Sequence, residues 1–453
     1  MSMEMDYGII SCIPITVLMV GVLLTKRITE MMVIASLMGA IFIHKANFFS
    51  GYIDMLYGTL NNSSYHFVLF ILMGFGGMIK LFQESGALLG FRHSLSKHVK
   101  GKKTPLIVAW FMAGVMFVDD YLCSLAVSFS MREITDENKI PREHLAFQVN
   151  VMSACICILI PFSSWVAFTT GLLNEQGAGF SDYIKGMPFM FYPIIMAVLC
   201  MLLALGVIPK VGAMKNSYER LENGGPILPP DKGNASIVNL EMENEVKESS
   251  ALNIIIPLVV MVATVLIYDN DLVHGIFACI ATQLVLYVGG KVMDLTKFVD
   301  SFYEGAKSMC SMAILVCFSF TLSQANETMG FFDFLIGGIS RNMPPELVPA
   351  LIFVSVGLAV FATAGYWVIQ IITIPVFIPL AMAVGLPVPI AVGAVMSGVA
   401  FGGNFCFYSD IVFMTSAGTG ISNVRQIKVA APYVLAVTAI TLVAYIALGF
   451  LIM

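Results

Sequence analysis

The stretch FVDDYLCSL, from Phe117 to Leu125, places two adjacent carboxylates, Asp119 and Asp120, inside an apolar part of the chain. The run TPLIVAWFMAGVM comes directly before it, and AVSFSM comes directly after it. An ionised carboxylate at membrane depth costs roughly 2.5 to 3.5 kcal/mol on insertion scales. Paired acids at this place are therefore expected to serve a function. The alternative is that they cap two separate short spans at a membrane surface.

Composition indicates the class of protein. Of the 453 residues, 58% are hydrophobic and 12% are charged, and the mean hydropathy is +0.87. A soluble domain carries roughly 25% charged residues, so these values predict an all-α polytopic membrane protein whose surroundings are the lipid bilayer. The net charge of -5 provides no basic face, which argues against a nucleic-acid partner.

A polar segment divides the chain into two parts of similar length. Residues 209–250 are rich in Glu, Asn, Gly and Pro and are interpreted as a linker between a first repeat, 1–208, and a second repeat, 251–453. A faint internal repeat supports this division. At a shift of 244 residues, four pairs of identical residues fall in register: Gly86 and Gly330, Phe117 and Phe361, Ser153 and Ser397, and Pro188 and Pro432.

The basic residues predict the topology, because Lys and Arg in short loops stay cytoplasmic. Both flanks of the DDY stretch are basic, so we expect a re-entrant hairpin at about 104–131 that enters from the cytoplasm. The second repeat is expected to be inverted, with an extracellular hairpin at about 346–385 that turns at TAGYW. This arrangement predicts a multi-pass protein of the cell membrane with a cytoplasmic linker and both termini outside. About ten spans are expected, near 8–25, 28–44, 64–83, 144–170, 188–208, 251–269, 273–290, 308–324, 388–418 and 429–452.

Two further stretches predict breaks in long helices. PFSSW, Pro161 to Trp165, combines a proline, which lacks a backbone donor, with two serine hydroxyls. SGVAFGGNFCFYSD, residues 397–410, contains Gly398, Gly402 and Gly403, which are expected to allow non-helical backbone and close helix approach. Opposed hairpin tips and broken helices create a polar cavity near the membrane midplane. A cavity lined by carboxylates and hydroxyls suits a small cation, a proton or an ion-coupled polar solute.

At these residues the sequence resembles the NhaC family of sodium/proton antiporters. The resemblance covers most of both halves. It includes DDY at 119–121, MREITD at 131–136, REHLA at 142–146, PFSSW, Trp367, IPLA at 378–381, SGVAFG at 397–402, SD at 409–410 and PY at 432–433. It implies a secondary transporter that exchanges sodium for protons by alternating access, with these ions as coupling ions and no other cofactor. Some members of the family exchange organic acids or take up amino acids.

The chain departs from the family pattern at three places. Gly403 and Asn404 occupy positions where the family usually has Asp-His. Asn150, Val151 and Met152 occupy positions where the family usually has Asp-Ser-Thr. The tip reads AGYW instead of a GTSW-like sequence, which provides Tyr366 and Trp367 as a wall for an organic solute. The candidate ion or substrate ligands are Asp119, Asp120, Tyr121, Asn150, Ser163, Ser164, Trp165, Thr363, Tyr366, Trp367, Asn404, Ser409 and Asp410. The candidate sodium ligands among them are Asp119, Asp120, Ser164, Asn404 and Asp410.

Several alternatives stay open at the level of sequence. Asp410 is also compatible with an interfacial position, and Trp165 and Trp367 with an aromatic belt. The transported solute is either a small cation alone or a small organic acid or amino acid, and a homodimer is compatible with the sequence. A channel or an intramembrane enzyme is a weaker alternative. A channel typically needs a symmetric ring or a continuous pore, and no nucleophile with a paired His or metal cluster supports an enzyme.

Overall fold

A computed structural model describes residues 7–25, 27–87, 90, 101, 103–228, 247–268, 271–331, 334, 344–407 and 409–452. Within these ranges the chain is helical and forms no strand. Eight helices are long and apolar enough to cross a membrane, or up to ten when each of two bent helix pairs counts as one span. The predicted class, an all-α polytopic protein with discontinuous helices, is confirmed.

The helices before the linker include two short ones that the sequence analysis assigned to no span, α3 and α10. The bounds in this half are α1 (Ile13–Thr25), α2 (Ile28–His44), α3 (Phe48–Leu60), α4 (Ser63–Glu84), α6 (Thr104–Val115), α7 (Asp120–Glu137), α8 (Arg142–Leu159), α9 (Ser164–Glu175), α10 (Phe180–Gly186) and α11 (Phe191–Leu205).

The helices after the linker follow the same order. When α6 is moved by 244 residues it becomes 348–359, which lies within α18, and α8 becomes 386–403, which overlaps α20 almost completely. This agreement supports the internal repeat, whereas the inversion of one half relative to the other stays a prediction. The bounds here are α13 (Leu252–Ile267), α14 (Leu272–Leu284), α15 (Leu295–Ser308), α16 (Cys310–Thr328), α18 (Val348–Thr363), α19 (Tyr366–Ala383), α20 (Val388–Phe405), α21 (Asp410–Thr419) and α22 (Asn423–Ile452).

Helices α6 and α7 form a hairpin, so that the end of α7 lies beside the start of α6. The backbone N–H of Gly101, before α6, donates to Asn138 Oδ1, after α7, at 3.1 Å. Leu106 and Ile140 pack together at the same base. With 12 residues, α6 is about 18 Å long at 1.5 Å per residue, well short of the roughly 30 Å of a hydrocarbon core. These features support a hairpin that does not cross the membrane, although its re-entry stays a prediction.

The corresponding pair in the second half, α18 and α19, differs in length. The chain turns between them at Ala364, whose φ is 59°, and Gly365. Each of the two helices is long enough to cross a membrane, so length alone does not favour re-entry at the predicted hairpin 346–385.

The glycines of α20 do not have the conformation that the sequence analysis expected. Gly398, Gly402 and Gly403 lie inside α20 with helical backbone, and the break in the chain comes later, at residues 406–409. The expectation of close helix approach is met instead. A Cβ at Gly398 would lie against the Phe353 carbonyl, and one at Gly402 against that of Gly357. These glycines therefore bring α18 and α20 together.

The predicted linker contains a helix that packs against the transmembrane helices. This helix, α12 (Gly212–Glu222), carries Arg220, which donates to both oxygens of Glu143 at the start of α8, at 2.7 and 3.0 Å. Arg425 of α22 donates to Glu143 Oε1 at 2.9 Å. Because the Glu143 side chain is fully buried, this cluster of three charges joins the first half, the linker and the second half.

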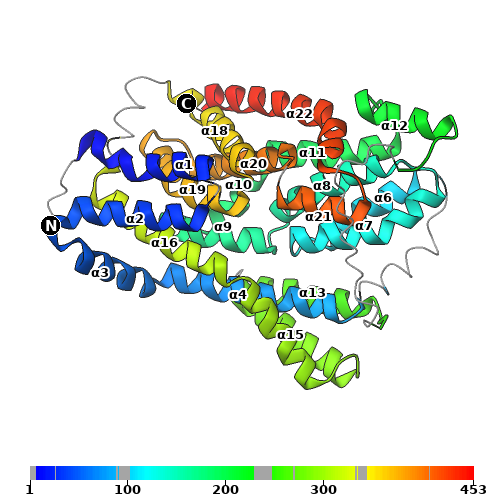
Figure 1. The fold of residues 1–453 in the computed structure, drawn as a ribbon, viewed down its shortest axis with the longest axis horizontal. Helices are drawn as coiled ribbons and strands as arrows, with labels where there is room; N and C mark the ends of the chain where they lie inside the picture. Colours follow the sequence, from blue (N-terminus) through cyan, green and yellow to red (C-terminus); the bar gives the residue numbers. More distant parts are fainter. Residues whose placement is uncertain are drawn as a thin grey trace.

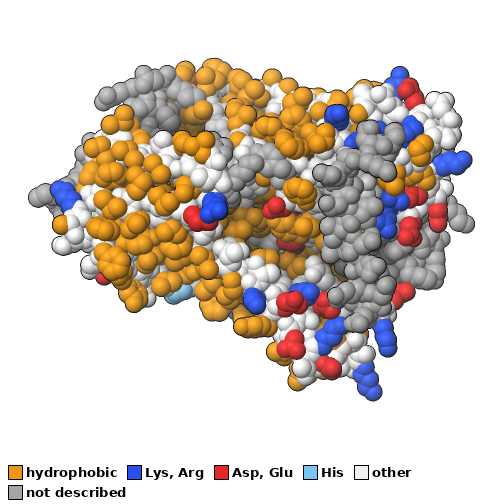
Figure 2. Space-filling view, in the orientation of Figure 1, with side chains coloured by type: hydrophobic (Ala, Val, Ile, Leu, Met, Phe, Trp, Pro, Cys, Tyr) orange, Lys and Arg blue, Asp and Glu red, His pale blue; other side chains and the backbone are white. Residues whose placement is uncertain are grey.

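Most helices run along the long axis of the molecule, with α12 near one end and α2 and α3 near the other (Figure 1). On the face shown in Figure 2, hydrophobic side chains cover much of the surface, and Lys, Arg, Asp and Glu side chains gather toward the end that carries α12 and α15. The apolar band fits a protein surrounded by lipid, and the charged end fits a surface in contact with water.

Candidate functional site

Four helix breaks occur in the parts of the chain that carry the predicted site. The first half is interrupted between α6 and α7 and between α8 and α9, where the two helix axes differ by 48°. The second half is interrupted between α18 and α19 and between α20 and α21. The break at PFSSW is therefore found where the sequence predicts it. In each half, two helices begin at the breaks and point their N-termini into the interior.

Contacts bring the four breaks together. The Ser164 backbone N–H donates to the Val118 carbonyl at 2.9 Å, which joins the two breaks of the first half. The Tyr366 and Ser409 hydroxyl oxygens lie 3.2 Å apart, which joins those of the second half. The Tyr121 hydroxyl donates to Asp410 Oδ2 at 3.1 Å, connecting α7 with α21. The N-termini of α7, α9, α19 and α21 therefore surround one region.

The four helices that begin at the breaks form two parallel pairs, α9 with α19 and α7 with α21. Trp165 packs beside Tyr366 with ring centroids 5.4 Å apart, and one turn later Thr169 Oγ1 donates to Gln370 Oε1 at 2.6 Å, so α9 and α19 run in the same direction. Helices α7 and α21 are also parallel, because Tyr121 meets Asp410 and Arg132 donates to the Gly418 carbonyl. Each pair directs two helix N-termini, the positive ends of the helix dipoles, toward the same region.

Asp119 has its hydrogen-bonding capacity largely used within the protein. It is the N-cap of α7, and its Oδ1 accepts from the Leu122 backbone N–H at 3.0 Å. Ser164 Oγ lies 3.4 Å from the other carboxylate oxygen and donates to it. Side-chain capping of a helix N-terminus contributes about 1 kcal/mol. Asp119 therefore has a structural role at the break in addition to its place in the candidate site.

The Asp120 side chain, unlike that of Asp119, is buried with its hydrogen-bonding capacity unused among the described residues. Its side chain is 1% exposed, and neither carboxylate oxygen makes a hydrogen bond of normal geometry within the described part of the chain. The indole Nε1 of Trp165, which is also buried, lacks such a bond as well. Buried polar atoms are nearly always hydrogen-bonded, and an unpaired buried charge is far more costly than an unpaired neutral group. Asp120 is therefore the group in this region that most needs a proton or a cation.

Aromatic side chains form one wall of the region. Trp165 lies between Tyr366 and Trp367, with ring centroids 5.4 and 5.3 Å away, and Phe168 meets Trp367 edge-on at 4.7 Å. Trp165 is fully buried, so it belongs to the interior rather than to an aromatic belt at the lipid surface. Trp367 is partly exposed.

The structure gives a physical reason for one departure from the family pattern. The ring of Tyr366 lies directly on the backbone of Gly403, and a Cβ at residue 403 would overlap the ring and its hydroxyl group. A carboxylate at residue 403 and a tyrosine at residue 366 are therefore incompatible in this arrangement. With Tyr366 in this place, only a residue without a side chain fits at position 403.

Asn150 and Asn404 form a separate buried pair. Asn150 Nδ2 donates to the Asn404 backbone carbonyl at 3.3 Å, and Asn404 Nδ2 donates to the Tyr192 hydroxyl at 3.4 Å. Both side-chain carbonyl oxygens lack a partner among the described residues. Neither amide is hydrogen-bonded to Asp119 or Asp120, so the pair has its own set of partners.

Four more candidate residues lie at the edges of the breaks. Asp410 is exposed, and its hydrogen-bond donor is Tyr121. Ser163 caps α9 by accepting from the Val166 backbone N–H at 3.2 Å, and Ser409 Oγ donates to the Gly403 carbonyl. The Thr363 hydroxyl donates to its own helix and accepts from the Gly365 N–H. These contacts stabilise the breaks.

A polar contact that the sequence did not predict continues the site into the core. Thr169 and Gln370 are both buried, and the Gln370 side chain also donates to the Tyr366 carbonyl at 3.4 Å. The pair lies one turn beyond the aromatic wall, between the parallel helices α9 and α19. A single Gln inside the apolar run YWVIQIITI was the signal in the sequence.

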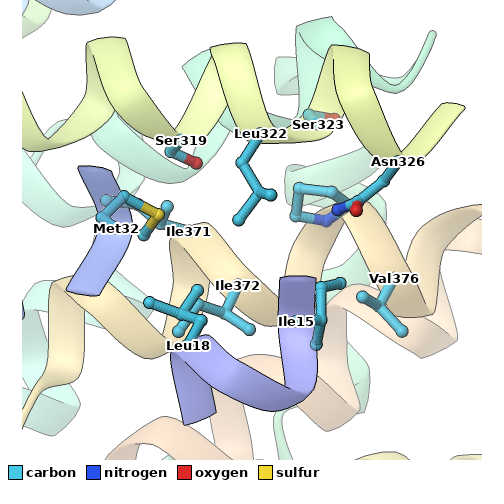
Figure 3. Close-up of a pocket in the computed structure, with 11 residues that line it drawn as sticks. Ile15, Leu18, Met32, Ser319, Leu322, Ser323, Asn326, Ile371, Ile372 and Val376 are labelled. Carbon is cyan, nitrogen blue, oxygen red and sulfur yellow. The ribbon is translucent and has the colours of Figure 1, made fainter. Parts of the chain in front are cut away.

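A second missed feature is the polar face of α16. Ser319, Ser323 and Asn326 point into a cavity of about 10 Å³, opposite apolar side chains from α1, α2 and α19 (Figure 3). The Asn326 side-chain oxygen has no partner within the described ranges. A cavity of this size holds about one water molecule, so it is too small for a transported organic solute.

The groups around the four breaks that could bind a cation are oxygen atoms of carboxylates, hydroxyls and backbone carbonyls. Among the described residues, no group of three or more His, Cys, Asp or Glu side chains is arranged to hold a metal ion such as zinc. Carboxylates, hydroxyls and backbone carbonyls are the ligands of hard cations. Broken helices around buried carboxylates, within a bundle of membrane-length helices, define a secondary transporter.

Comparison with known proteins identifies the family. Residues 156–450 match the model of the Na+/H+ antiporter family, which is more than half of the chain. The chain belongs to the Na+/H+ antiporter family, and it is a transporter of the antiporter type. The resemblance to the NhaC type that the sequence motifs indicated is therefore confirmed.

One relative and two solved structures are similar to this chain, and the first of the two structures supports the fold. An uncharacterized protein of Haemophilus influenzae (strain ATCC 51907 / DSM 11121 / KW20 / Rd) is 25% identical over 430 residues, covering 86% of this chain and 79% of the relative. The crystal structure of the Alcanivorax borkumensis YdaH transporter matches with a TM-score of 0.58 and 15% identity, covering 89% of this chain and 88% of that one. Neisseria gonorrhoeae MtrF matches with a TM-score of 0.48 and 14% identity, covering 89% and 83%.

Proposed function

We propose that this protein exchanges sodium for protons, and that the two ions compete for the carboxylates of Asp119 and Asp120. The observation that carries the proposal is the Asp120 side chain, which is buried with both oxygens unpaired in the described structure. Ionising such a group without a counter-charge is costly, so it is neutralised either by a proton or by a bound cation. One ion must leave before the other binds.

The surrounding groups support a small hard cation. Asp119 Oδ2 and Ser164 Oγ lie 3.4 Å apart beside the break, and the adjacent Asp120 adds a second carboxylate. These oxygens would hold sodium from the first half of the chain. Asn404 and Asp410, the other proposed sodium ligands, are hydrogen-bonded to other groups, and we propose that they join this centre after a change of conformation.

Alternating access follows from the arrangement of the breaks. The four helix ends meet through side-chain contacts between the halves, such as Tyr121 with Asp410 and Trp165 with Tyr366, and not through continuous helices. Such contacts can be exchanged when one set of helices tilts against the other. The cation site would then open to one side of the membrane at a time.

The proposal includes an orientation. We place the protein in the cell membrane with the linker and α12 on the cytoplasmic side and both termini outside, because most Lys and Arg residues then face the cytoplasm. A homodimer is part of the proposal, and the mass of the purified protein in detergent tests it.

A second candidate function is the coupled transport of a small organic acid or amino acid. The N-caps of α19 and α21, Gly365 and Ser409, make no side-chain capping hydrogen bond, unlike those of α7 and α9. Uncapped N-termini favour a carboxylate, and the wall formed by Trp165 and Trp367 suits an apolar group. This combination favours an organic anion at the second-half breaks.

Calorimetric titration of sodium into the purified protein tests the first proposal. In buffers of different ionisation enthalpy, sodium binding should release about one proton, and the apparent affinity should fall up to tenfold for each pH unit of acidification. Asp120→Asn should abolish the titration signal. Sodium binding without proton release and without pH dependence between about pH 5 and 9 would contradict competition. Thermal stabilisation by carboxylates or amino acids, with no sodium binding, would favour the second candidate.

A further inference from the structure

The small cavity of about 10 Å³ between α16 and α19 is lined by an unusual number of oxygen atoms. On the α16 side, Ser319, Ser323 and Asn326 point into it (Figure 3). The Asn326 side chain is 3% exposed, and its Oδ1 has no hydrogen-bond partner among the described residues. Because buried polar atoms are nearly always paired, this oxygen is expected to contact a ligand in the cavity.

Two prolines inside α19 leave further oxygen atoms without their usual helical partners. Pro375 and Pro379 have no backbone N–H, so they cannot donate to the carbonyls four residues earlier, which belong to Ile371 and Pro375. Both Ile371 and Pro375 line the cavity. Carbonyls that are freed in this way inside a membrane protein are satisfied by polar side chains, by water or by a bound ion.

The electrostatics of the cavity favour a cation. Asn326 lies in the last turn of α16, which ends at Thr328, and the C-terminal end of a helix carries partial negative charge. The Asn326 Oδ1 and the two freed carbonyls accept hydrogen bonds and cannot donate them. A water molecule has only two protons to donate, whereas a cation can contact these three oxygens and the two serine hydroxyls together.

The residues that line the cavity select a monovalent cation. No ionisable side chain is among the described lining residues, and the side chains from α1, α2 and α19 are apolar. A divalent ion keeps several of its waters unless carboxylates replace them, and a volume of about one water molecule leaves no room for such a shell. Uncharged carbonyl and hydroxyl oxygens suffice for sodium or potassium in membrane proteins.

We propose that this cavity binds one alkali-metal cation, held by Asn326 Oδ1, the hydroxyls of Ser319 and Ser323, and the carbonyls that the prolines of α19 leave free. The site is separate from the carboxylates, because neither Asp119 nor Asp120 lines it. It therefore does not depend on the proposed exchange of sodium for protons. Sodium and potassium share the required chemistry, and the experiment distinguishes them.

Occupancy would connect two groups of helices. The cavity is lined by α1, α2 and α16 on one side and by α19 on the other. Helix α19 begins at Tyr366 and Trp367, which form the aromatic wall, and it pairs with α9 through Gln370. A cation in contact with both α16 and α19 would fix the helix that carries this wall, and loss of the cation would allow that helix to tilt.

The test measures thermal unfolding of the full-length Asp120→Asn variant, which lacks the ionisable group of the proposed exchange site. At constant ionic strength, sodium chloride replaces choline chloride in one arm and potassium chloride replaces it in another. We expect saturable stabilisation by sodium, by potassium or by both. Because no ionisable side chain lines the cavity, the stabilisation should be the same between about pH 5 and 9.

Two results of this test would overturn the proposal. One is equal stability in all three salts. The other is stabilisation that disappears at acidic pH, which would assign the cation to a remaining carboxylate. Failure of sodium/proton exchange is read separately, from proton release when sodium is titrated into the wild-type protein.

Matched substitutions on α16 locate the cation within the same background. Asn326→Leu removes a ligand and should lower the apparent affinity by about tenfold or more. Gln324→Leu makes the same kind of change on the exposed face of the helix and should keep the parent response. Ser319→Ala combined with Ser323→Ala provides a second loss of ligands in case the leucine variant does not fold. An unchanged response in both cavity variants, or an equal loss in Gln324→Leu, refutes the site.

Discussion

The two halves of the molecule have their helix breaks in the same order, but the side chains at the breaks differ. In the first half, Asp119 and Ser163 cap the helices that begin at the breaks, and Asp120 is buried beside them. In the second half, neither Gly365 nor Ser409 provides a side-chain cap, and the one acid, Asp410, is exposed.

This difference shows which features a repeated fold preserves and which it does not. The positions of the breaks are set by backbone geometry and by helix packing, and both halves retain them. The side chains at the breaks differ. The first half carries two buried carboxylates there, Asp119 and Asp120, whereas Tyr366 and Trp367 of the second half pack against Trp165 of the first.

The largest expected effect tests that division of roles. Asp120→Asn should lower sodium-driven proton flux in proteoliposomes at least a hundredfold, a barrier increase of about 2.7 kcal/mol, because it removes the ionisable group and nearly preserves its shape. Asp410→Asn should also lower the flux, but less than Asp120→Asn does, because Asp410 is proposed to join the site only after a change of conformation. The thermal midpoint of Asp120→Asn should not fall, since neither Asp120 carboxylate oxygen makes a hydrogen bond of normal geometry to the described residues. Comparable losses of flux in both variants would show that the halves share the charge.

The second prediction concerns the contact that separates this chain from the family pattern. Gly403→Ala should destabilise the protein by about 1 to 3 kcal/mol, because the added methyl group overlaps the Tyr366 ring. In the presence of Tyr366→Ser the same change should cost much less. A double-mutant cycle on the free energy of unfolding in mild detergent measures this coupling, expected at about 0.5 to 3 kcal/mol. Additive effects would mean that the ring does not exclude a side chain at residue 403.

The smallest effect distinguishes capped from uncapped breaks. Ser163→Ala should cost about 1 kcal/mol of stability, because the Val166 N–H loses its acceptor. Ser409→Ala should cost a smaller amount, about 0.5 kcal/mol, since Ser409 contributes hydrogen bonds to Tyr366 and Gly403 but no cap. Unfolding of both variants under the same conditions gives the comparison. A larger loss for Ser409→Ala would contradict the assignment of caps.

The sequence predicted the helix breaks because each has a local cause. Pro161 lacks a backbone donor, and Asp119 and Ser163 are residues that favour N-cap positions, so composition within a few residues was sufficient. The class of protein followed from hydropathy for the same reason. The glycines of α20 were misread because a glycine that permits close packing and one that permits irregular backbone look identical in a sequence.

Other features of the candidate site depend on contacts between distant segments. The overlap of Tyr366 with Gly403, and the pairing of Thr169 with Gln370 across 201 residues, arise only when α9, α19 and α20 come together. That neither Asp120 oxygen makes a hydrogen bond of normal geometry to the described residues likewise depends on every neighbour that surrounds it. A local sequence pattern carries no information about these distances. The sequence therefore predicted that Tyr366 and Trp367 would form a wall, but not how their rings would pack.

The buried carboxylate of Glu143 has a consequence for biosynthesis. Its two partners, Arg220 and Arg425, are synthesised 77 and 282 residues later. Both arginines follow the first half in the chain, and Arg425 follows it by most of the second half. A buried carboxylate without a partner is strongly unfavourable. The start of α8 therefore has to remain hydrated or incompletely packed during insertion, and the first half reaches its final packing only after the linker has followed it out of the ribosome.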